Sequence, residues 1–165
     1  MLRNDIGLAL SARTVTGVSQ AVKRCPWVNG EPQAAGDAVK HNYRKLCLAF
    51  ATAKGRPSDG NLHEWRKQTK YTLHELQLLF VKKSKYIVKL IHRLHRLAER
   101  LGDDHDLAVL RHKVRQNRGT LGPSATFRPL IDSIEHRRAA LQSAAWAEGR
   151  RICAQTPKHL LRQLA

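Results

Sequence analysis

Five basic side chains recur at helical spacing near the middle of the chain. They are His63, Arg66, Lys67, Lys70 and His74, and at about 100° per residue they fall on one stripe of a helix. An arginine fork can bind two phosphate oxygens, lysine supplies a mobile point charge, and histidine can donate from its ring. No nucleophile with a base and an orienting group stands out in the sequence. We therefore predict a site that holds an anion and is not catalytic.

The helix that must carry this stripe is predicted over residues 61–80. Asn61 followed by Glu64 has the form of a capping box, and neither Gly nor Pro interrupts the segment. A second, apolar stripe lies roughly 120° around the same cylinder. Its members are Leu62, Trp65, Thr69, Leu73, Leu76 and Phe80. This pattern predicts that one face packs in a bundle while its neighbour presents the cations.

A similar pattern comes earlier, over residues 34–54. Its apolar face is formed by Val39, Tyr43, Leu46 and Phe50. The run His41-x-x-Arg44-Lys45 repeats the form of His63-x-x-Arg66-Lys67. Arg44 and Lys45 are therefore further candidates for anion binding, with ordinary surface charge as the alternative.

A third segment, residues 86–101, also sets an apolar stripe beside a basic one. The apolar residues are Ile87, Leu90, Ile91, Leu94, Leu97 and Leu101, and the basic ones are Lys85, Lys89, Arg93, Arg96 and Arg100. Helices joined by a short connection usually pack antiparallel. We therefore expect cations from both helices to line one groove, with Lys89, Arg93, Arg96 and Arg100 as secondary anion contacts.

The run Asp103-Asp104-His105-Asp106 is the strongest alternative site. Carboxylates and a histidine can bind a divalent metal, and a metal-dependent phosphohydrolase would be centred here. However, consecutive residues cannot all point at one ion, and the chain has no H-E-x-x-H motif. We predict instead that Gly102 ends one helix and that the aspartates cap the next, so no metal or other cofactor is expected.

Residues 107–116, 130–154 and 158–164 are also predicted to be helical, with Arg137 and Arg138 on an outer face. Ser124 or Thr126 can start the second of these helices, and Pro129 is tolerated in a first turn. No segment alternates as a strand does. The predicted fold is all-α, an antiparallel helical bundle over residues 31–165, preceded by an N-terminal helical segment and turn over residues 1–30.

The motifs resemble those of a known family. His63-x-x-Arg66-x-x-x-Lys70, followed by LGDDHDLAVL at residues 101–110, is similar to the CHAD domain, an all-helical module named for its conserved histidines. Weaker similarity covers Tyr43-Arg44-Lys45 and Pro157-Lys158. Members bind inorganic polyphosphate in a basic channel and often accompany triphosphate-tunnel domains. The resemblance implies the same ligand here, with His63, Arg66 and Lys70 of the shared motif among its contacts. The helical stripe adds Lys67 and His74 to these first contacts.

The chain differs from the family pattern in two ways. Leu73 and His74 stand where the family has an arginine and a tyrosine. The family has two helical halves, and this chain resembles the C-terminal one. A single half predicts a weak homodimer that supplies the second wall of the channel, or a monomer closed by its own residues 6–23.

Composition agrees with a polyanionic partner. The 165 residues carry a formal net charge of +17, which suits polyphosphate or, as the alternative, nucleic acid. Aromatic residues make up only 5%, which disfavours a base-stacking platform. The sequence shows neither a membrane-spanning run nor a secretory signal. Cys25, Cys47 and Cys153 are predicted to be free thiols in a reducing cytoplasm.

Overall fold

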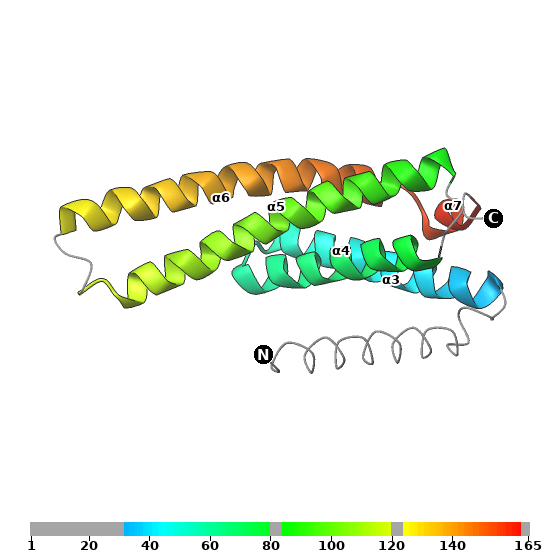
Figure 1. Cartoon of the computed structure of the whole chain (residues 1–165), viewed down its shortest axis with the longest axis horizontal. Coiled ribbons are helices and arrows are strands. Elements are labelled where there is room, and N and C mark those ends of the chain that lie inside the picture. Colours follow the sequence, from blue (N-terminus) through cyan, green and yellow to red (C-terminus); the bar gives the residue numbers. More distant parts are fainter. Residues whose placement is uncertain (1–31, 80–83, 120–123, 163–165) are drawn as a thin grey trace, which may run out of the picture. The chain divides into compact units, whose positions relative to one another are not determined.

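The computed structural model describes residues 32–79, 84–119 and 124–162, which form helices and no strand (Figure 1). The helices are α3 (Pro32–Gly55), α4 (Asp59–Leu79), α5 (Lys85–Gln116), α6 (Ser124–Cys153) and α7 (Pro157–Arg162). The all-α prediction is confirmed. The chain divides into two compact units, residues 1–38 and 39–165, and the description below concerns the second. The helix predicted over residues 6–23, the turn that follows it and Phe80 lie outside the described residues.

The long helices of this unit pack antiparallel, as predicted. α4 packs closely along α5, and α5 along α6. His63 of α4 contacts His105 of α5, and Arg96 of α5 contacts Glu148 of α6. In each pair, a residue from the first half of one helix contacts a residue from the second half of the next, as antiparallel packing requires. The apolar stripes predicted for α4 and α5 are buried, including Trp65, Leu94 and Leu97. No helix among the described residues is long and apolar enough to cross a bilayer.

α3 joins the bundle through large aromatic side chains. Phe50 lies 5.2 Å from the buried Trp65 of α4, measured between ring centroids. Trp65 in turn stacks on Trp146 of α6, with centroids 4.9 Å apart and planes 4° from parallel. Beside this stack, α6 carries Gly149, where an added Cβ would lie 2.7 Å from both Phe50 and Trp65. The aromatic contact between three helices therefore requires glycine at this position.

One predicted helix start is wrong. α4 begins at Asp59, because the Ser58 hydroxyl accepts the N–H of Asn61 at 3.2 Å and caps the helix. The predicted capping box of Asn61 and Glu64 does not form, since the Glu64 carboxylate contacts Lys67 and Gln68 instead. α6 begins at Ser124, one of its two predicted starts, so Pro129 lies in its second turn. Ser84 caps α5, accepting the N–H of Ile87 at 3.3 Å.

The predicted break at Gly102 is also wrong. α5 runs without interruption from Lys85 to Gln116, so the aspartates at 103, 104 and 106 lie inside a helix and cap nothing. A glycine in a helix costs only about 1 kcal/mol. Packing against α4 on one side and α6 on the other outweighs that cost, since most helical stability in proteins comes from tertiary contacts.

We expect Gly149→Ala to lower the free energy of unfolding by about 1–3 kcal/mol, because the methyl group overpacks the aromatic stack despite alanine's helix preference. Urea denaturation followed by circular dichroism measures it. Gly60→Ala is the matched control, since nothing lies within 4 Å of a Cβ there. Equal stability of the two variants would contradict this role for Gly149.

Candidate functional site

Asp104 of the aspartate run forms a buried ion pair with Arg138 of α6. Its Oδ1 accepts the Arg138 Nε–H at 3.0 Å and the Gln142 Nε2–H at 2.9 Å. The side chains of Asp104 and Arg138 are only 2% and 4% exposed. The prediction that Arg138 lies on an outer face is wrong, because its partner is far away in the sequence and left no local signal.

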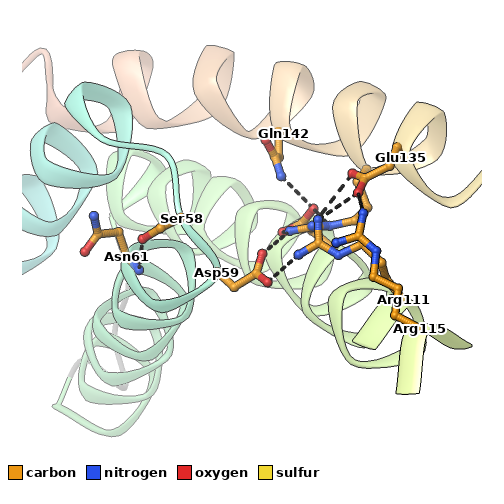
Figure 2. A network of polar contacts seen from close by, with 9 residues as sticks. Ser58, Asp59, Asn61, Arg111, Arg115, Glu135 and Gln142 are labelled. Atoms are coloured by element: carbon orange, nitrogen blue, oxygen red, sulfur yellow. Dashed lines mark hydrogen bonds and ion pairs between the residues drawn. The ribbon is translucent and has the colours of Figure 1, made fainter. Parts of the chain in front are cut away.

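The ion pair extends into a network that reaches three helices (Figure 2). Arg138 also donates to Asp59, the first residue of α4, at 2.7 Å. Asp59 accepts a second bond, at 2.5 Å, from Arg111 of α5, which also contacts Glu135 of α6 at 2.8 Å. The network thus connects the start of α4, the middle of α5 and α6. Among the described residues no group of His, Cys, Asp and Glu is arranged to hold a metal ion.

A groove between α4 and α5 receives part of the predicted cationic stripe. Its volume is about 330 Å³, and α4 lines it with Arg66, Lys70 and His74. The Arg66 Nε is buried and has no hydrogen-bond partner among the described residues. The facing wall of α5, however, is acidic. It contributes Glu99, Asp103 and Asp106 beside His95, so cations face carboxylates across this groove.

A larger groove, of about 530 Å³, lies between α5 and α6. Arg96 and Arg100 of α5 line it together with Arg137 of α6, above a floor that includes Ala140 and Leu141. Glu99 and Asp103 line this groove as well as the first one. The residues that line the second groove therefore include three guanidinium groups and two carboxylates, a formal excess of one positive charge before buried Glu148 is counted.

Buried Glu148 of α6 holds the arginines near this groove. Its Oε1 accepts hydrogen bonds from Arg96 Nε at 3.2 Å and Nη2 at 2.9 Å. Arg100 lies 3.5 Å and Arg151 3.8 Å from the same oxygen. Glu148 is 3% exposed, and three guanidinium groups around one carboxylate leave donors free to bind an anion. This role could not be predicted from the sequence, because Glu148 approaches Arg96 and Arg100 only through the packing of α6 on α5.

The other candidate residues lie elsewhere, so the prediction that basic residues of both helices line one groove is wrong. Lys67 and Lys45 line a separate groove between α3 and α4, with Lys67 in an ion pair 2.5 Å from Glu64. His63 packs on His105, with ring centroids 5.0 Å apart. The physical reason is the angle around α5, which directs Arg96 and Arg100 to the groove beside α6. The remaining candidates are Arg44, beside a pocket at the end of α6, Lys89, which is exposed, and Arg93, which is half-buried.

Comparison with known families gives one match, and it decides the assignment. A sequence model of the CHAD domain matches residues 9–115, which include both motifs described above. The chain belongs to the CHAD family. No curated protein and no solved structure matches it. The match ends near the end of α5, so the α6 wall of the larger groove lies outside the matched part of this CHAD protein.

We expect Asp104→Ala to lower the free energy of unfolding of this CHAD domain by about 3–5 kcal/mol, because it leaves the buried Arg138 guanidinium without a counter-charge. Urea denaturation measures the change. The exposed neighbour gives the control: Asp103→Ala should stay within about 0.5 kcal/mol of wild type. Asp104→Leu combined with Arg138→Met should recover much of the loss. Equal effects at positions 103 and 104 would contradict a structural role for the buried pair.

We expect the stability contributed by Asp59 to be lost in acid. Burial raises the pKa of the Asp59 carboxyl, but hydrogen bonds and charge from Arg138 and Arg111 outweigh it and hold that pKa below its usual range. The contribution is therefore complete above the unfolded pKa, about 3.9, and disappears as the pH falls through the folded value. Asp59→Asn should be less stable than wild type at neutral pH, with a difference that shrinks below about pH 4. Urea denaturation across this range is the measurement, and a gap that does not change with pH would argue against it.

Proposed function

We propose that this CHAD domain binds inorganic polyphosphate without turning it over, and that the groove between α5 and α6 is its main contact surface. The observation that carries this proposal is the set of arginines at that groove, Arg96, Arg100 and Arg137, two of them held by buried Glu148. Guanidinium groups suit phosphate because each presents several fixed donors.

Charge balance favours this groove over the one beside α4. The α4 groove places Arg66 and Lys70 opposite three carboxylates, and a polyanion entering it would approach like charge. We propose that Lys70, His63 and His74, all exposed on α4, make outer contacts with a chain that extends beyond the larger groove. Family membership supports the ligand, and the arginine geometry supports the place.

In this proposal, Glu148 also reduces the conformational entropy that the arginines lose on binding. Arginine side chains lose rotamer freedom when they bind a ligand. Two of the groove's arginines already contact a fixed carboxylate. Part of their side-chain entropy is therefore lost when the protein folds, and less remains to be lost when the ligand binds. A phosphate chain would then use the guanidinium N–H groups that point away from Glu148.

We expect Arg100→Gln/Arg137→Gln to weaken polyphosphate binding by about tenfold or more and to reduce the slope of log affinity against log salt by about two, since each lost phosphate contact removes roughly one unit. Isothermal titration with a polyphosphate of defined length, repeated at several salt concentrations, measures both. Arg96 is retained so that Glu148 keeps a partner.

Two matched variants give the comparison. Lys54→Gln/Arg128→Gln removes the same charge from exposed positions that line neither groove, and should change affinity only slightly. Arg66→Gln/Lys70→Gln tests the α4 groove. A larger loss there than in Arg100→Gln/Arg137→Gln would move the site to α4, and no loss in either would overturn electrostatic binding through these grooves.

The alternative ligand is nucleic acid, which the net charge also suits. Competition between polyphosphate and duplex DNA at equal phosphate concentration and salt separates the two. Polyphosphate should displace DNA, and equal displacement would indicate a general polyanion binder. Release of orthophosphate in the presence of a divalent metal would instead indicate a phosphohydrolase.

A further inference from the structure

Cys47 and Cys153 are far apart in the sequence and meet where α3 contacts the end of α6. Both are free thiols and half-buried, and both pack against the hydrophobic core. Each thiol interacts with the other closely enough to shift its pKa. Both also line one pocket of about 440 Å³, together with Arg44 and the residues that follow α6. The two thiols therefore lie at the same pocket and within reach of a small solute.

The contact is fixed by groups other than the thiols. The Tyr43 hydroxyl, one turn before Cys47, lies 2.6 Å from the carbonyl oxygen of Ile152 and 3.1 Å from that of Gln155, and donates its proton to them. These carbonyls lie on either side of Cys153. Tyr43 is only 2% exposed, so this bond between α3 and α6 is shielded from water. It keeps the two cysteines together whatever the state of their sulfur atoms.

The two thiols are not equivalent. The hydrogen bond from Cys153 holds the pKa of the Cys47 thiol below its usual range, although burial acts in the opposite direction. The same hydrogen bond, together with burial, raises the pKa of the Cys153 thiol. Cys47 is thus the one that ionises first. A thiolate is the reactive form of cysteine, and oxidation is selective for it.

We propose that Cys47 and Cys153 form a reversible oxidation site, in which a hydroperoxide oxidises Cys47 and Cys153 then closes a disulfide between α3 and α6. This inference is independent of anion binding, because neither cysteine lines the groove between α5 and α6.

The chemistry balances with hydrogen peroxide as the oxidant. The Cys47 thiolate attacks one peroxide oxygen, the O–O bond breaks, and the sulfur becomes a sulfenic acid while the leaving hydroxide takes a proton to form water. The Cys153 sulfur then attacks the Cys47 sulfur. An S–S bond forms, the S–O bond breaks, and the hydroxyl leaves as water with the Cys153 proton. In total two thiols and one peroxide give one disulfide and two waters, and a thiol reductant reverses the change.

The test uses the full chain with Cys25→Ser, so that only these two cysteines remain. After treatment with hydrogen peroxide, non-reducing peptide mapping by mass spectrometry should show a peptide pair linked between positions 47 and 153 within one chain. The melting temperature should rise by several degrees and fall back after dithiothreitol, because a disulfide that closes a long loop constrains the unfolded chain. Absence of that cross-link, or a cross-link between two chains, would overturn the proposal.

Two further variants on the same background test the order of events. Cys153→Ser should accumulate a sulfenic acid on Cys47 that dimedone traps. Cys47→Ser should leave Cys153 largely unmodified under the same conditions. Equal labelling of the two remaining cysteines would show that Cys47 is not the preferred site of attack, and would also count against the proposal.

Discussion

The buried ion pair between Asp104 and Arg138 is the constraint on which the rest of this bundle depends. Both side chains are more than nine-tenths buried, so each is tolerable only with the other in place. The pair fixes the register of α6 against α5. Through Asp59 it also fixes the start of α4. That register places Glu148 beside Arg96. It also brings Arg137 of α6 to the groove that Arg100 of α5 lines, and together these arginines make the groove cationic.

The distribution of charge matters more than its total. The chain has an excess of 17 positive charges, yet its candidate cations do not converge on one surface. Glu99 and Asp103 line both main grooves, and Asp106 faces Arg66 and Lys70. These carboxylates reduce the attraction of the α4 groove for a polyanion. The groove between α5 and α6 keeps its positive excess because α6 adds Arg137.

α6 lies outside the part of the chain that matches the family. Residues 9–115 match the CHAD domain, whereas Arg137, Arg138, Glu148 and Cys153 all come later. The chain's buried ion pair, its larger groove and its cysteine pair each combine residues of the matched part with residues of α6. Within the described residues, α6 therefore completes features that the matched segment begins.

The sequence by itself determined the fold class, the apolar faces of α3, α4 and α5 and the family, because helical periodicity and the two motifs are local patterns. It could not determine which cations share a groove, since that depends on the angle at which α5 meets its neighbours. The predictions for Asp104 and Arg138 were wrong because they also depend on how the helices pack. An aspartate after a glycine has the local pattern of a helix cap, whereas the partner of Asp104 lies 34 residues away in the sequence. Cys47 and Cys153 likewise carry no spacing signal, and the contact of α3 with α6 alone brings them together.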